Sequence, residues 1–220
     1  MNLKPRPQPL VIWGASGHAR VVADIVRLTG NFNIVGFLDS VDPGRKGTDF
    51  CGAPVLGGEE QLEFLREKKI RHLSLGIGDC QARLSLAATV SQFGFELATL
   101  VHPGATISED VFLGPGTVVM AGAVVNPGST IGENVIVNTS SSVDHDCSVD
   151  NGVHIGPGAH LGGGVSIGQG TWVGIGAIVK DKIRIGRGTV IGAGAVVLND
   201  IPDYVIAFGV PAKIIRKREE

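Results

Sequence analysis

The sequence predicts a small α/β domain followed by an all-β parallel β-helix. Two observations lead to this prediction. Branched aliphatic residues recur at every sixth position from Val101 to Val197 without a break. The chain before Val101 instead alternates short apolar runs with amphipathic helical patterns. We place the boundary near His102, which gives an N-terminal domain of residues 1–101 and a C-terminal domain of residues 102–220.

The N-terminal half contains strand and helix signals in alternation. The expected elements are a strand at 10–13, a helix from about 18 to 30, a strand at 34–38, a helix at 59–69, a strand at 72–77, a helix at 81–93 and a strand at 96–101. This alternation indicates βαβ units and a small, Rossmann-like parallel sheet. Residues 40–58, rich in Gly, Pro and Asp, are expected to be a long connection that covers a site.

The C-terminal half is built from six-residue units. Glycine directly follows many of the periodic aliphatic residues, and a small or β-branched residue usually stands four positions after each of them. Such a unit is too short for a helical hairpin and suits one short strand and a sharp turn. Hexapeptide repeats of this kind stack into parallel β-helices that share one continuous core. Three units per coil predict a triangular prism of between five and six coils.

A glycine-rich turn follows the first expected strand and holds Ser16, Gly17 and His18. Such a turn exposes backbone N–H groups at a helix N-terminus, which suits phosphate, although an ordinary tight turn explains it as well. Asp39 ends the second expected strand, where an acid commonly accepts ribose hydroxyls, and Gly78 lies at the end of the third. Because parallel strands end at one edge of a sheet, these residues together favour nucleotide binding.

His145 lies between two carboxylates, Asp144 and Asp146, two positions after the inward-facing Val143. We therefore expect the imidazole at a corner of the prism, pointing outwards. An imidazole beside a carboxylate is suited to act as a general base, although a solvated surface histidine is the common alternative. Strand alternation would place residues 145 and 146 on opposite faces, so either Asp144 or Asp146 can be the carboxylate that orients His145.

The composition argues against several classes of protein. A net charge of −2 and no long basic run argue against nucleic-acid binding. The three cysteines have neither disulfide nor zinc spacing, so we expect no metal site and a reducing cytoplasm. Cys147 falls in the small-residue core phase of the repeat, where an inert thiol is expected. The segment 1–9 lacks a signal-peptide core, and no stretch is apolar enough to span a membrane.

Three motifs together resemble one family of enzymes. They are the turn at 14–18, the stretch 138–147 and the Gly-Val-Pro-Ala-Lys ending at 209–213. They resemble the nucleotide-amino-sugar N-acetyltransferases of the bacillosamine and perosamine pathways, together with the related sialic acid O-acetyltransferases. The resemblance implies a left-handed β-helix, acetyl-CoA as co-substrate, a nucleotide-activated amino sugar as acceptor, and a homotrimer with active sites between neighbouring prisms.

The resemblance also implies roles for individual residues. His145 would be the general base and Asp146 its carboxylate partner, where some members have Glu. The remaining residues divide between the nucleotide (Ser16, Gly17, His18, Asp39 and Gly78), the acceptor group (Asn138) and acetyl-CoA (His154, Gly163, Ile175 and Ala193).

The predicted reaction is transfer of an acetyl group to the amine of a nucleotide-linked 4-amino-4,6-dideoxyhexose. One alternative is O-acetylation of a sugar hydroxyl such as that of sialic acid, which the same base would serve. A second is a non-catalytic nucleotide-sugar binding scaffold. A nicotinamide oxidoreductase fits worst, because the turn lacks a third glycine and the repeats would have no role.

Overall fold

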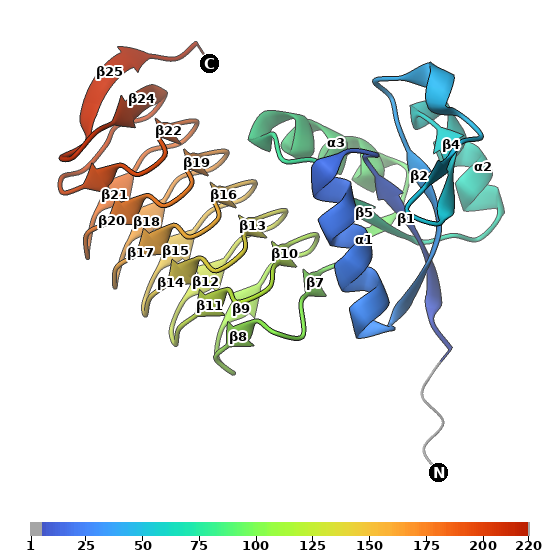
Figure 1. Cartoon of the computed structure of the whole chain (residues 1–220), viewed down its shortest axis with the longest axis horizontal. Helices are drawn as coiled ribbons and strands as arrows, with labels where there is room; N and C mark the ends of the chain where they lie inside the picture. The colour runs from blue at the N-terminus through green and yellow to red at the C-terminus, as the bar shows by residue number, and fades with distance from the viewer. Residues whose placement is uncertain (1–5, 220) are drawn as a thin grey trace. The chain divides into compact units, whose positions relative to one another are not determined.

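A computed structural model describes residues 6–219 of the chain (Figure 1). The chain forms two compact units, which divide between Pro103 and Gly104. The predicted boundary lay between residues 101 and 102. Within the described residues, none of the helices has the length and apolar character needed to cross a membrane. The expectation that residues 1–9 lack a signal-peptide core falls partly on residues 1–5, which lie outside the described range.

The first unit is an α/β layer structure with a central sheet in the order β3-β4-β2-β1-β5-β6. The strands are β1 (Gln8–Trp13), β2 (Phe32–Leu38), β3 (Asp49–Phe50), β4 (Ala53–Gly57), β5 (His72–Leu75) and β6 (Glu96–Leu97). The helices are α1 (Gly17–Thr29), α2 (Leu62–Glu67) and α3 (Cys80–Gln92), with short 3-10 turns at Pro43–Arg45 and Glu59–Gln61. All neighbouring strands are parallel except β3, which is antiparallel to β4.

Helices cover both faces of this sheet because its strands alternate apolar side chains to either side. Val11 and Trp13 of β1 pack in one buried cluster with residues of α2 and α3. Ile12 points to the other face, where Gly76 lies closely between it and Ala19 of α1. The predicted Rossmann-like layers are therefore present.

Two expected elements of this unit are wrong in detail. Residues 40–58 form a 3-10 turn and two strands, and β4 joins the sheet beside β2 rather than remaining a loop. Apolar residues at alternating positions of 53–57 are buried against the sheet, a pattern that the many glycines and prolines of the segment obscured. The expected strand at 96–101 is also two short strands, β6 and β7 (Leu100–Val101).

The second unit is a parallel β-helix of two-residue strands, seen in Figure 1 as a row of stacked coils. Partners in neighbouring coils are 18 residues apart, as in the pairs Val118↔Ile136 and Ser142↔His160, so three hexapeptides make one coil. The strands are β8 (Thr106–Ile107), β9 (Phe112–Leu113), β10 (Val118–Val119), β11 (Val124–Val125), β12 (Thr130–Ile131), β13 (Ile136–Val137), β14 (Ser142–Val143), β15 (Ser148–Val149), β16 (His154–Ile155), β17 (His160–Leu161), β18 (Ser166–Ile167), β19 (Trp172–Val173), β20 (Ile178–Val179), β21 (Arg184–Ile185), β22 (Val190–Ile191) and β23 (Val196–Val197).

The coils contribute to three sheets, which we name by their runs of strands. The first sheet runs β10-β13-β16-β19-β22, the second β8-β11-β14-β17-β20-β23, and the third β9-β12-β15-β18-β21. The predicted six-residue series supplies the second residue of every strand, and from Val119 onwards all of these side chains are buried. An antiparallel hairpin of β24 (Val205–Phe208) and β25 (Lys213–Lys217) continues the first sheet.

The stability of the prism should depend on the inward side of each strand. Ile155 is fully buried, whereas Ile215 in β25 is 53% exposed. We expect Ile155→Ala to cost roughly 2–5 kcal/mol of unfolding free energy, because it leaves a cavity in a packed interior. Ile215→Ala should change it by no more than about 0.5 kcal/mol. Urea unfolding of both variants measures the difference, and equal midpoints would contradict the buried stack of aliphatic residues.

Candidate active site

Two groups of predicted site residues lie in depressions of the surface, one in each unit. In the first unit a cleft of about 620 Å³ opens at the carboxyl ends of β1 and β2, beside the loop that follows β5. Ser16, Asp39 and Gly78 line this cleft, while Gly17 and His18 begin α1 directly behind Ser16. The structure therefore brings together the residues predicted to hold a nucleotide.

The turn between β1 and α1 depends on a close approach of two glycines. Gly14 has a φ of 127°, and a Cβ built there would lie 2.6 Å from the carbonyl oxygen of Gly76. Ser16 is the N-cap residue of α1, but its side chain makes no capping hydrogen bond, and the first turn holds no acidic residue. The N–H groups of a first helical turn have no partner inside the helix, so this turn suits an anion.

A buried arginine donates hydrogen bonds to the backbone of the loop after β5. Arg83 of α3 is 1% exposed, and its Nη1 donates to the carbonyl oxygens of Ile77 and Gly78 at 3.1 and 2.9 Å. Burial lowers the pKa of this guanidinium. Arg83 is not apparent as a site residue from the sequence, because an arginine within a helix normally lies on the solvated face.

The carboxylate of Asp39 already makes hydrogen bonds and an ion pair within the first unit. Its Oδ1 accepts hydrogen bonds from the backbone N–H groups of Val41 and Asp42 at 3.0 and 3.2 Å. Its Oδ2 pairs with Nη1 of Arg45 at 3.0 Å, and Arg45 also donates to the carbonyl oxygen of Ala15. Arg45 comes from the segment 40–58 and lines the cleft. Arg45 is not apparent as a site residue from the sequence, because nothing in the local pattern shows that this segment folds back to the glycine turn.

In the second unit, His145 lies at a corner between the second and third sheets, with its side chain 61% exposed. Its Nδ1 and Oδ2 of Asp146 are 2.7 Å apart. The pKa of His145 is raised, first by this hydrogen bond and further by the charges of Asp144 and Asp146. The expected outward-facing corner position is therefore observed.

The geometry resolves which carboxylate orients the imidazole. Asp144 accepts hydrogen bonds from the backbone N–H of His145 at 2.8 Å and from Nδ2 of Asn126 at 2.9 Å. These hydrogen bonds, the backbone one foremost, lower the pKa of Asp144. Asp146 has a φ of 57°, so the strand alternation that separates neighbouring side chains does not apply to it. Asp146 is consequently the partner of the imidazole.

Gly163 lies one coil above His145 and leaves space for its ring. A Cβ at position 163 would be 2.6 Å from Nε2 and 2.7 Å from Cε1 of His145. The two residues line a depression of about 640 Å³ together with Lys180, Asp181 and Lys182. Of the four residues predicted to contact acetyl-CoA, Gly163 is the one that the chain places against His145.

The other predicted cofactor residues lie elsewhere on the same prism. His154 is 8% exposed on the first sheet, where it stacks on Trp172 with ring centroids 5.7 Å apart. Its Nε2 and Nδ2 of Asn138 are 2.9 Å apart. Because an amide nitrogen only donates, Nε2 is the acceptor and the ring proton is on Nδ1. Asn138 and His154 therefore form one cluster on the first sheet, away from the His145 corner.

Ile175 and Ala193 stack 18 residues apart at the corner between the first and second sheets. Ile175 is 58% exposed, and Ile178 beside it is 49% exposed. The second sheet separates this corner from that of His145. One side of a coil spans six residues, or up to roughly 20 Å at about 3.3 Å per residue. Ile175 and His145 therefore lie at different corners of one chain.

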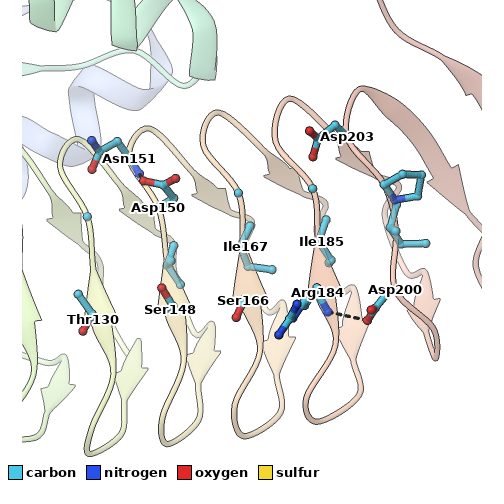
Figure 2. A pocket seen from close by; sticks show the side chains of 16 residues that line it. Thr130, Ser148, Asp150, Asn151, Ser166, Ile167, Arg184, Ile185, Asp200 and Asp203 are labelled. Carbon is cyan, nitrogen blue, oxygen red and sulfur yellow. Dashed lines mark hydrogen bonds between the residues drawn. The ribbon is translucent and has the colours of Figure 1, made fainter.

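A third depression, of about 800 Å³, lies on the third sheet (Figure 2). Short hydroxyl side chains, Thr130, Ser148 and Ser166, follow one another along it up to Arg184, whose backbone N–H donates to Asp200 at 2.8 Å. None of the predicted site residues lines it. It contains no imidazole or thiol, so its size alone does not indicate catalysis.

Metal and thiol chemistry find no further support in the described residues. No group of three His, Cys, Asp or Glu side chains there has the arrangement to hold a metal ion. Cys147 is 2% exposed, and burial raises the pKa of its thiol, so it is a poor nucleophile.

Comparisons with known proteins find relatives of both units. The PglD N-terminal domain family matches residues 9–90, and the bacterial transferase hexapeptide family (six repeats) matches residues 104–139 and 164–199. A mutant of perosamine N-acetyltransferase from Caulobacter crescentus, solved in complex with CoA and GDP-perosamine, is 41% identical. The match covers 95% of this chain and 97% of that one, with a TM-score of 0.91.

Two further solved structures are similar along nearly their whole length. The acetyltransferase domain of PglB from Neisseria gonorrhoeae FA1090, in complex with acetyl coenzyme A, is 40% identical over 95% of this chain and 100% of that one, with a TM-score of 0.88. WeeI from Acinetobacter baumannii AYE is 26% identical over 94% and 100%, with a TM-score of 0.85. The second unit is accordingly a left-handed parallel β-helix.

The hydrogen bond between His145 and Asp146 predicts that substitution of Asp146 changes the pKa of His145. We expect Asp146→Asn to lower the pKa of His145, because it removes the hydrogen bond that contributes most to raising it. NMR titration of the His145 ring signals measures the shift. Asp144→Asn is the matched control, since Asp144 contacts the backbone rather than the ring, and should shift the pKa less. A larger shift in Asp144→Asn would assign the orienting role to Asp144.

Proposed function

Because the chain belongs to the family of hexapeptide-repeat N-acetyltransferases of nucleotide-linked amino sugars, we propose that it transfers the acetyl group of acetyl-CoA to the amine of such a sugar. The observation that carries the proposal is the His145–Asp146 pair at 2.7 Å at an open corner of the prism. The cleft of the first unit provides a separate place for the nucleotide.

His145 acts as the general base in this reaction. Asp146 accepts a hydrogen bond from Nδ1–H, and the neutral ring then presents Nε2 as the proton acceptor. The sugar amine attacks the thioester carbonyl carbon, a C–N bond forms, and the amine proton passes to Nε2. The C–S bond then breaks and CoA leaves as the thiolate, which takes up the proton. No covalent enzyme intermediate is needed, and holding both reactants in one site supplies much of the acceleration.

We further propose that the active site lies between two prisms of a homotrimer. His145 and Gly163 occupy one corner of a chain, whereas Ile175 and Ala193 occupy another, with a whole sheet between them. A neighbouring prism that presents its own Ile175 corner to His145 would complete the acetyl-CoA site. The exposed Ile175 and Ile178 offer an apolar surface for such a contact. We place the enzyme in the cytoplasm, where acetyl-CoA and nucleotide sugars are available.

The proposed activity is tested by measuring CoA-thiol release from acetyl-CoA with a panel of acceptors. The panel contains UDP- and GDP-linked 4-amino-4,6-dideoxyhexoses and sialic acid. We expect rapid release with one nucleotide amine. We also expect His145→Ala to lower turnover by about 10²–10⁴-fold, as for loss of a general base, while acetyl-CoA still binds.

His160→Ala is the matched control for this variant. His160 is another exposed histidine of the prism, paired with Ser142 at 2.8 Å, and its loss should leave turnover close to wild type. Release with sialic acid alone would move the assignment to O-acetylation. Wild-type turnover in His145→Ala would remove His145 from the mechanism.

An active site formed by two chains predicts that two inactive variants recover activity when they are mixed. His145→Ala removes the base. Ile175→Glu places a negative charge in the proposed acetyl-CoA site, where it would repel the anionic cofactor. Co-expressed in mixed trimers, the two should recover activity at roughly a quarter of the sites, those that combine the intact residue of each chain. His145→Ala mixed with the double variant is the control and should stay inactive. Absence of recovery in the first mixture would place each site within one chain.

A further inference from the structure

We propose that Arg45 binds the diphosphate of the nucleotide sugar, and that Asp39 acts on the nucleotide by positioning Arg45 rather than by touching the ribose. This inference rests on the proposed function, because it concerns the nucleotide part of the same substrate. Arg45 is then a binding residue. Asp39, which the sequence suggested would accept ribose hydroxyls, is then a residue that positions Arg45.

The charges that line the cleft of the first unit support Arg45 as the anion ligand. Three charged residues line it, Asp39, Asp42 and Arg45, and among the described residues there Arg45 is the one cation. Without Arg45 the lining would carry two carboxylates and would repel a diphosphate. A nucleoside diphosphate in this cleft therefore needs the guanidinium as its counter-charge.

The position of Arg45 fits this role. Its Nη1 donates to the carbonyl oxygen of Ala15, which belongs to the turn that begins α1. The guanidinium thus lies beside the first N–H groups of a 13-residue helix, which Ser16 leaves uncapped by its side chain. Cation and helix N-terminus meet at one place, and both favour a phosphate there.

The guanidinium is held in place while keeping donors for a ligand. Both of its described hydrogen bonds use Nη1, so Nε and Nη2 keep N–H groups with no hydrogen bond to a described residue. The charge lies 5.1 Å from the ring centroid of Phe50, a 5% exposed residue of β3. The 3-10 turn at Pro43–Arg45 and the β3–β4 hairpin therefore support an arginine whose remaining donors can bind phosphate in a forked manner.

Asp39 is poorly placed to serve as a free ribose acceptor. A carboxylate offers about four acceptor positions, and two backbone N–H groups and Arg45 already occupy three of them. The side chain is 11% exposed. Its contacts close the turn after β2 and fix the guanidinium, so Asp39 is a positioning residue.

The test measures binding of GDP and UDP by isothermal titration calorimetry, without acetyl transfer. We expect Arg45→Ala to weaken the binding of the preferred nucleotide by about 10–100-fold, as for loss of a charge-assisted hydrogen bond. The corresponding nucleoside, which has no phosphate, should bind wild type and variant equally. Arg45→Lys should recover part of the loss, because it keeps the charge but not the forked geometry.

Arg27→Ala is the matched control. Arg27 donates to the carbonyl oxygen of Cys51 and so contacts the same segment, but it does not line the cleft. It removes the same charge and should leave nucleotide affinity unchanged. An equal loss in both variants, or wild-type affinity in Arg45→Ala, would overturn the assignment. If the wild-type protein bound neither GDP nor UDP, the nucleotide part of the proposed function would fail, and this inference with it.

A double-mutant cycle tests the role of Asp39. We expect Asp39→Asn to weaken nucleotide binding in the wild-type background and to have little further effect in Arg45→Ala. Binding of the 2′,3′-dideoxynucleoside diphosphate should show the same pattern, because no ribose hydroxyl contacts the carboxylate. A loss of the same size in both backgrounds, absent with the dideoxy ligand, would show that Asp39 contacts the ribose directly.

Discussion

The in-register stacking of aliphatic side chains at every sixth residue is the constraint on which the second unit depends. Neighbouring coils, whose paired residues are 18 positions apart, are joined by backbone hydrogen bonds such as that from His154 N–H to Thr171 O at 2.9 Å. A two-residue strand has no stability by itself, so each strand is held by its neighbours in the adjoining coils. Because all coils share one geometry, each corner residue is placed directly over its counterpart in the coil below.

Two features of one corner shape the surroundings of His145. At the corner that holds His145, neighbouring coils have Gly128 and Gly164 at the position with positive φ, whereas this coil has Asp146. An aspartate in that conformation costs on the order of 1 kcal/mol, and its carboxylate gains the hydrogen bond to the imidazole. One coil above, Gly163 leaves the space that the ring occupies. Asp146 thus contacts the imidazole at Nδ1, and Gly163 leaves space on the side of Nε2.

The first unit uses its regularity in a comparable way. Parallel strands deliver the turn after β1, Asp39 and the loop after β5 to one edge of the sheet, and the approach of Gly14 to Gly76 closes that edge. Buried Arg83 holds one loop from below, while Asp39 and Arg45 hold another. Charged groups bound to backbone atoms therefore fix two loops of the cleft, which is largely preformed.

The sequence alone determined both architectures, because periods of six residues and of alternating strand and helix are local properties that survive in one dimension. It also located His145 at an outward corner, since the repeat phase predicts which positions face the interior. Tertiary structure alone decided that Asp146 and not Asp144 bonds to the ring, because a residue with positive φ breaks the alternation from which the sequence argument proceeds. It likewise decided that Arg45 reaches the glycine turn and that Ile175 lies on a different edge from His145. The contact of Arg45 and the separation of Ile175 from His145 both relate residues about 30 positions apart in the sequence. They follow from how the chain folds back on itself rather than from any local pattern.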